Sequence, residues 1–357
     1  MRHTPRMRSP TFSANRRARC SSDGRDDHRA RERHDAGRTV TMRIGVIGVG
    51  GHSTTNLLPH ARAAGLDLVA TCARHIERAR AVADRWGAAH AYDDAEQMLA
   101  EADVDGVVVC VQPWDYAPLI RLCLTAGKPV FCDKPGAGSS AEARELAGLS
   151  STTGVPVVVG YMKRFAPAYQ RAREIVQSPE FGVPSLASFT FAVGRGFGDD
   201  LRTYLIDNPV HPLDLARYIV GELDELEARV VDTAGGGFAV AAVARASSGA
   251  VCTFNLCTTA SWSQQNERVE VYGAGHAVVV ENIDTCIHRP PERPEHRWRP
   301  NYTVGMPMNS SPTISGFLPE LEHFRQVAVE GASNRSDMQS AAATLALAER
   351  LCRFAGV

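Results

Sequence analysis

The chain has 357 residues, which is too long for one small core and sufficient for two domains. It has the composition of a globular protein, with 44% hydrophobic and 22% charged residues, and the lack of any run of about 18 apolar residues excludes a transmembrane helix. Residues 1–41 carry 11 Arg and 5 acidic residues, a balance of +6, whereas the other 28 basic and 35 acidic residues balance to −7. The mildly acidic remainder therefore offers no general attraction for nucleic acid.

Residues 1–41 form an Arg-rich segment with no periodic pattern and almost no large apolar side chains. Such a segment cannot bury enough surface to order itself, so we expect a disordered tail or an upstream misread start, with Met42 as the preferred start. No apolar stretch follows the basic residues, which disfavours secretion. A nucleic-acid-binding arm is the alternative interpretation of this tail.

The nine cysteines are an odd number and form no C-x-x-C pair. Several of them lie in apolar, strand-like runs. This usage indicates reduced, buried thiols in a cytoplasmic protein, and it predicts neither a disulfide framework nor a metal site.

Short apolar runs alternate with helical stretches over residues 42–162, the first predicted domain. We predict strands at 43–47, 67–71, 107–111, 129–132 and 155–161, and helices at 53–64, 75–86, 116–126 and 140–152. This alternation predicts a parallel sheet with helices on both faces, an α/β domain.

The pattern changes over residues 163–357, the second predicted domain, where strand-like segments follow one another. We predict strands at 185–193, 227–232, 238–244, 250–257, 268–272 and 277–281, and helices at 212–220, 318–329 and 336–354. Residues 286–312 are predicted to form a long surface loop. This order predicts an α+β domain with an open, mainly antiparallel sheet.

A glycine-rich turn, Gly48-Val49-Gly50-Gly51-His52-Ser53, links the first predicted strand to the first helix. Gly48 and Gly50 fit the first two positions of G-x-G-x-x-G, and Ser53 is a small residue at the third. Glycines there let the backbone approach a pyrophosphate, which then rests on the helix N-terminus, so we predict that residues 42–162 form an α/β Rossmann dinucleotide-binding domain. The alternative is an ordinary glycine-rich turn.

The second predicted strand leads into Ala73 and Arg74. An acid at the place of Ala73 would bind the adenosine ribose hydroxyls and repel a 2′-phosphate. A missing carboxylate followed by a guanidinium favours NADP(H), with NAD(H) also possible. The alternative is that Arg74 is a solvated residue at the start of a helix.

Two further runs contain candidate catalytic side chains. Lys134 follows the strand at 129–132, at the sheet edge where ligands bind, and can hydrogen-bond a substrate hydroxyl. His211 precedes Pro212, which suits the first position of a helix, and a helix N-terminus keeps an imidazole neutral, as a general base requires. Asp207 could orient the second ring nitrogen. The alternatives are a surface lysine beside Asp133 and a histidine that only caps the helix.

Four motifs in order resemble those of one family: the G-x-G turn, the runs at 127–135 and 160–167, and Asp207-x-x-x-His211-x-x-Asp214. From Met42 to about residue 355 the chain resembles the glucose–fructose oxidoreductases, inositol dehydrogenases and rhizopine-catabolism proteins, the Gfo/Idh/MocA family. The resemblance implies that Lys134, Asp207 and His211 form the catalytic group.

The resemblance also implies a set of cofactor-binding positions: Gly48, Gly50, Gly51, His52, Ser53, Ala73, Arg74, Gln112, Pro113, Trp114, Asp133, Lys134 and Arg164. The chain departs from the family pattern in two places. Asp133 stands where the family has Glu, and Ala117 stands where the family often has His, with Trp114 as a candidate replacement wall of the pocket.

The function implied by this resemblance is reversible hydride transfer between a nicotinamide cofactor and a secondary alcohol or ketone of a sugar, sugar derivative or cyclitol. His211 would take the hydroxyl proton, Lys134 would position the oxygen and Asp207 would orient the base. We expect a homodimer or homotetramer built on the open sheet of the second domain, and neither a nucleic-acid nor a membrane partner. The alternative is a non-catalytic sensor or regulator with the same fold.

Overall fold

The computed structural model describes residues 41–194, 200–233, 236–261, 263, 266–303 and 305–357, all of which belong to one compact unit. The predictions for residues 1–40 lie outside the described residues. Within the described part of the chain, no helix is both long and apolar enough to cross a bilayer.

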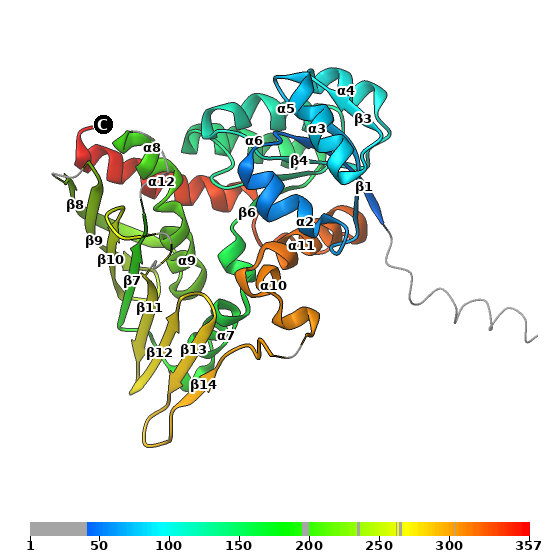
Figure 1. Ribbon diagram of the computed structural model, residues 1–357. Coiled ribbons are helices and arrows are strands. Elements are labelled where there is room, and N and C mark those ends of the chain that lie inside the picture. The colour runs from blue at the N-terminus through cyan, green and yellow to red at the C-terminus, as the bar shows by residue number, and fades with distance from the viewer. Residues whose placement is uncertain (1–40, 195–199, 234–235, 262, 264–265, 304) are drawn as a thin grey trace, which may run out of the picture. The chain divides into compact units, whose positions relative to one another are not determined.

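The first sheet has six strands in the order β3-β2-β1-β4-β5-β6 and is parallel throughout (Figure 1). The strands are β1 (Met42–Ile47), β2 (Leu66–Cys72), β3 (His90–Tyr92), β4 (Gly106–Val109), β5 (Val130–Asp133) and β6 (Val157–Gly160). Strands β4, β5 and β6 are buried along their whole length, which confirms the Rossmann prediction. The strand order reverses between β1 and β4, the place where doubly wound sheets bind ligands.

Helices connect these strands in the predicted order: η1 (Ser53–Leu57), α2 (Leu58–Ala61), α3 (Ile76–Trp86), α4 (Ala95–Glu101), η2 (Pro113–Asp115), α5 (Tyr116–Thr125) and α6 (Ser140–Thr153). The helix predicted over 53–64 is present, but it ends at Ala61 and its first part, η1, is π-helical. Strand β3 and helix α4 were not predicted. The N-cap of α4, Asp94, accepts a hydrogen bond from the Gln97 backbone N–H.

The second sheet has eight strands in the order β14-β13-β12-β11-β7-β10-β9-β8. They are β7 (Leu186–Ala192), β8 (Leu223–Asp232), β9 (Phe238–Ala246), β10 (Val251–Cys257), β11 (Asn266–Gly273), β12 (His276–Glu281), β13 (Thr285–Arg289) and β14 (His296–Trp298). Only the β7–β10 pair among them is parallel, which confirms the prediction of an open, mainly antiparallel sheet. The remaining helices are η3 (Met162–Phe165), α7 (Pro167–Val176), η4 (Pro179–Phe181), α8 (Leu201–Asp207), α9 (Val210–Val220), η6 (Pro307–Asn309), α10 (Ser311–Ser315), α11 (Phe317–Glu330) and α12 (Met338–Ala355).

The predicted loop at 286–312 was wrong in its first part, where β13 and β14 extend the sheet. Cys286 and Ile287 are buried, whereas the other residues of these strands are mostly polar. Charged and polar side chains are typical of edge strands, because they discourage pairing with another chain. Because the edge strand β14 is polar, its sequence shows no apolar alternation from which a strand could be predicted.

Helix α11 lies late in the chain but completes the core of the first domain. Its residues Leu321, Phe324 and Val327 belong to the apolar cluster beneath β1 and α2. The ring of Phe324 lies 6.0 Å from that of Phe131 on β5. Packing therefore crosses the domain boundary that we place at residue 162, and that boundary stays a prediction.

Candidate active site

The turn after β1 has the geometry of a close backbone approach. Gly48 has a φ of +93°, and a Cβ at this position would lie 2.1 Å from the carbonyl oxygen of Cys110. A Cβ at Gly50 or Gly51 would meet no atom within 4 Å. Ser53 is buried, and its hydroxyl donates to the Gly50 carbonyl over 3.0 Å. The turn thus leaves open space at its outer side, as a bound pyrophosphate would require.

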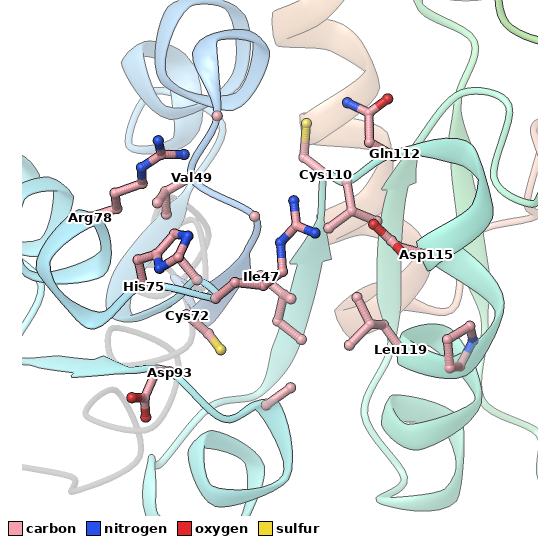
Figure 2. A pocket seen from close by; sticks show the side chains of 17 residues that line it. Ile47, Val49, Cys72, His75, Arg78, Asp93, Cys110, Gln112, Asp115 and Leu119 are labelled. Atoms are coloured by element: carbon pink, nitrogen blue, oxygen red, sulfur yellow. The ribbon is translucent and has the colours of Figure 1, made fainter. Parts of the chain in front are cut away.

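A pocket of about 510 Å³ opens next to this turn, between the ends of β1, β2 and β4. Five of the predicted cofactor positions line it, namely Gly48, Gly50, Ala73, Arg74 and Gln112. Figure 2 shows His75 and Arg78 on one side of the pocket and Gln112, Asp115 and Leu119 on the opposite side. This is the carboxyl edge of the sheet at the reversal of strand order, where the adenosine half of a dinucleotide fits.

Our sequence analysis missed two basic residues of this pocket, His75 and Arg78. Arg78 is the third residue of α3, so one helical turn carries its side chain back to the same edge as Arg74. Helix periodicity combined with the position of Ala73 could have identified it. Asp93, which follows β3, also lines the pocket and is the acidic residue on that side (Figure 2).

Lys134 follows β5 directly, as predicted, and forms an ion pair with Asp207 at the end of α8. Its Nζ donates to Asp207 Oδ1 over 2.8 Å and to the Asp207 carbonyl over 3.1 Å. Burial alone would lower the pKa of Lys134, but the carboxylates of Asp207 and Asp133 outweigh it and raise that pKa. The ammonium is therefore charged and held in place near neutral pH.

His211 is the second residue of α9, close to the helix N-terminus as predicted. The helix begins earlier than expected, so Pro212 is its third residue and not its first. Burial lowers the pKa of His211 well below its ordinary value, and the ammonium groups of Lys134 and Lys163 lower it further. The imidazole is therefore neutral at pH 7, as a general base requires.

Asp207 does not orient His211 as we expected. Its Oδ1 accepts from Lys134, whereas the buried Nδ1 of His211 has no hydrogen-bond partner among the described residues. The buried Oδ1 of Asn208, a residue that the sequence analysis did not select, also has none. Buried polar atoms are normally paired, so unpaired ones at a candidate site are hydrogen-bonding groups that a polar ligand could use.

His52 and Asp133 form a second pair beside the first. Nε2 of His52 lies 3.5 Å from Asp133 Oδ2, and Asp133 is almost fully buried. The carboxylate of Asp133 raises the pKa of His52 despite the opposing effect of burial. Burial would raise the pKa of Asp133, but His52 and Lys134 together lower it. The family's usual Glu is thus replaced by an ionised Asp that reaches His52.

Two expected cofactor residues have other contacts. The Arg164 guanidinium is buried and outside the pocket lining, and it donates to both carboxylate oxygens of Asp214. It also donates to the Arg335 carbonyl and to the Ser340 hydroxyl on α12. Its hydrogen-bonding capacity therefore serves the scaffold. Trp114 is about half exposed, lies against Gly138 and has the Arg202 guanidinium 5.8 Å from its ring centroid, while Pro113 before it is buried. Within the described residues, no cluster of three or more metal-ligating side chains is found.

A parallel sheet of this order, a glycine turn after β1 and an open second sheet define a two-domain protein that binds dinucleotides. Residues 42–161 match the family model described as "Oxidoreductase family, NAD-binding Rossmann fold", and residues 169–279 match the "GFO/IDH/MocA C-terminal domain". Together these matches cover more than half of the chain. The chain therefore belongs to the Gfo/Idh/MocA family, which confirms the resemblance read from its motifs.

Three similar proteins illustrate the range of the family. The chain is 32% identical over 212 residues to an inositol 2-dehydrogenase of Rubrobacter xylanophilus, covering 57% of this chain and 58% of that protein. It is 30% identical over 200 residues to a D-xylose 1-dehydrogenase (NADP(+)) of Haloferax volcanii, covering 54% of this chain and 61% of that protein. The crystal structure of a dehydrogenase from Chromobacterium violaceum shares its fold, with a TM-score of 0.79 at 23% identity over 88% of this chain and 95% of that one. The chain thus spans about three fifths of the length of the first two relatives.

Proposed function

We propose that this protein is an NAD(P)-dependent dehydrogenase that acts on a secondary alcohol of a sugar, sugar derivative or cyclitol. The observation that carries the proposal is the Lys134–Asp207 ion pair at the end of β5. The Lys134 charge acts on the neutral His211, whose Nδ1 has no hydrogen-bond partner among the described residues. The family membership and the names of the relatives support the same class of reaction.

Lys134, His211 and Asp207 would have different roles in the oxidation of the alcohol. Lys134 donates a hydrogen bond to the substrate oxygen and stabilises the negative charge that develops there. His211 takes the hydroxyl proton on a ring nitrogen, which its neutral state leaves available. Asp207 holds the lysine in place. When bound, the nicotinamide supplies C4 as the acceptor of the hydride that leaves the carbon.

A panel of sugars and cyclitols, followed by absorbance of the reduced nicotinamide, tests this function. Lys134→Met and His211→Ala should each lower turnover by about 10²–10⁴, the usual scale for a positioned acid–base group. Cofactor affinity, measured in parallel, should change far less, because the phosphates rest on the glycine turn. Lys128→Met is the control, since Lys128 precedes β5 at the opposite edge of the sheet and bonds the Val104 carbonyl.

The alternative, a sensor that binds cofactor and performs no turnover, makes a different prediction. It would bind cofactor tightly and show no activity of the wild type on the whole panel. An intact lysine, aspartate and histidine favour the enzyme, because a sensor has no use for a neutral base beside a fixed ammonium group.

We further propose that NADP(H) is the preferred cofactor. Ala73 replaces the acid that would repel a 2′-phosphate at the end of β2, and Arg74, His75 and Arg78 line the same pocket, in which Asp93 is the acid on that side. Ala73→Asp should move the preference toward NAD by on the order of tenfold or more. Arg78→Ala should weaken NADP(H) binding selectively, whereas Arg85→Ala, on the same helix but outside the pocket, should not. Tighter binding of NAD than of NADP by the wild type would contradict the proposal.

The outer face of the second sheet is our proposed surface for a homodimer or homotetramer. Leu186, Val251 and Tyr272 are exposed and lie side by side on β7, β10 and β11, and Val243 is exposed on the neighbouring β9. Contiguous exposed apolar side chains are typical of protein–protein interfaces. Light scattering should find an oligomer for the wild type and a smaller species for Val251→Glu, and a monomeric wild type would refute the proposal.

A further inference from the structure

His52 is held in one orientation by three neighbours. The Asn56 amide Nδ2 lies 3.0 Å from Nδ1 of His52, so the amide donates and Nδ1 accepts. The neutral ring then carries its proton on Nε2, which faces Asp133 Oδ2 at 3.5 Å. The ring of Phe317 on α11 meets it edge-on at 5.7 Å. An imidazole fixed in this way is a built part of the site.

The position of His52 follows from the path that a cofactor must take. Under the proposed function, the pyrophosphate rests on the turn that contains His52, and the nicotinamide reaches Lys134. His52 extends from that turn to Asp133, the chain neighbour of Lys134. Because one ribose joins the pyrophosphate to the nicotinamide, the nicotinamide comes to lie beside the His52–Asp133 pair.

We propose that His52 and Asp133 form a titrating pair beside the nicotinamide, and that protonation of His52 favours binding of the reduced over the oxidised cofactor. The oxidised nicotinamide carries a positive charge and the reduced one carries none. When His52 is neutral, Asp133 leaves one uncompensated negative charge at the ring. When His52 is protonated, that charge is cancelled and the attraction for the oxidised form is lost. The inference rests on the proposed function, since it uses the proposed place of the nicotinamide.

Lys134, His211, Asp133 and Asp207 lie around His52, and we expect each of them to keep one protonation state near neutral pH. Despite its burial, Lys134 has its pKa raised by Asp207 and Asp133, and it remains charged. Burial lowers the pKa of His211, and it remains neutral. Asp133 and Asp207 supply negative charges, and the Asp133 charge raises the pKa of His52 above its ordinary value.

Glu320, on α11 one turn after Phe317, is the remaining acid that faces this region. It is fully buried, and its two carboxylate oxygens have no hydrogen-bond partner among the described residues. Burial raises the pKa of Glu320 well above its usual range, and the charge on Asp133 raises it further. It is therefore the rival titrating group, and the experiment has to separate it from His52.

The test measures binding of the oxidised and the reduced cofactor separately, without substrate, by calorimetry from about pH 6 to about pH 9. The ratio of the two dissociation constants should shift toward the reduced form at acid pH by on the order of tenfold. In buffers of different ionisation enthalpy, the oxidised cofactor should release protons that the reduced cofactor does not, because its charge lowers the proton affinity of His52. This second measurement uses the wild type alone and does not depend on any variant folding.

His52→Gln and Asp133→Asn should each remove the pH dependence of the ratio. His90→Gln, on β3 outside the pocket lining, and Glu320→Gln should retain it. A pH-independent ratio in the wild type, its persistence in His52→Gln or its loss in Glu320→Gln would overturn the proposal. Because no substrate is present, these results are separate from the fate of the proposed dehydrogenase activity, which the turnover of Lys134→Met and His211→Ala decides.

Discussion

Two ion pairs in this protein use the same chemistry for different purposes. Arg164 and Asp214 are both buried, and their bidentate contact is completed by the Arg335 carbonyl and by hydroxyls of α12. Lys134 and Asp207 also pair, but they lie next to a buried imidazole nitrogen and an amide oxygen that have no partner among the described residues. The comparison teaches that burial of a charge does not mark a functional site. The second pair differs from the first because unpaired polar atoms lie beside it in the described part of the chain.

The largest effect on stability should come from removing the carboxylate of the first pair. Asp214→Ala leaves the Arg164 guanidinium buried without a counter-charge, which should lower the free energy of unfolding by about 3–5 kcal/mol. Urea unfolding measures this change. In the exposed Arg121–Glu145 pair, Glu145→Ala should cost no more than about 1 kcal/mol. Equal losses in the two variants would refute the contrast between buried and exposed pairs.

The second pair should show the opposite balance of effects. Asp207→Asn keeps the shape and one acceptor but removes the charge that holds Lys134, so turnover should fall about 10²–10³-fold. The free energy of unfolding should fall by less than in Asp214→Ala, because the amide still accepts from Lys134 and Asp133 remains as a counter-charge. Steady-state kinetics and urea unfolding on the same preparation test both statements, and an unchanged turnover would remove Asp207 from the catalytic group.

Acid should act on a histidine of the scaffold. His323 is buried and accepts a hydrogen bond from the Arg335 backbone N–H, and burial lowers its pKa to about 4 with a further contribution from Arg335. Between about pH 6.5 and about pH 4 the unfolded chain binds a proton on His323 and the folded protein does not. The free energy of unfolding therefore decreases as pH falls through this range and is unaffected by His323 above it. In His323→Gln the decrease in the free energy of unfolding on acidification should be smaller than in the wild type by roughly 3 kcal/mol. His90→Gln, on an exposed edge strand, should behave as the wild type.

The smallest effect should be a change in the proton affinity of His211. Its pKa is lowered by burial first and by the charge of Lys134 second, so Lys134→Met should raise it toward the ordinary histidine value. An NMR titration of the ring protons measures this directly and needs no turnover. Lys128→Met is the matched control. A His211 titration that is the same in Lys134→Met and wild type would mean that the two side chains do not interact.

The elements that could be predicted from the sequence are those with a strong local signal. The first sheet could be predicted from the continuous apolar runs of β4 and β6 and from the glycine turn after β1. Strands that are buried on both faces are apolar along their whole length, which is a clear signal in the sequence. Strand β3 has three residues and β14 is polar, so neither has an apolar pattern to find.

The candidate site was predictable in its residue types and less so in its contacts. Lys134 could be placed because the end of a parallel strand is a defined position. The hydrogen-bond partner of Asp207 could not be predicted, because the choice between Lys134 and His211 depends on how segments that are distant in sequence pack together. Arg164 illustrates the same limit, since its position in a motif does not reveal that Asp214 and α12 occupy its guanidinium.

The packing of α11 against β1 and β5 has a consequence for synthesis on the ribosome. The strands of the nucleotide-binding domain emerge first, but Leu321, Phe324 and Val327 emerge only after the whole second sheet has been translated. At about 5–20 residues per second, Met42, Ile44 and Phe131 wait for many seconds with part of their apolar surface uncovered. Apolar surface left uncovered in this way favours aggregation, so we expect a chain truncated before α11 to be prone to aggregate.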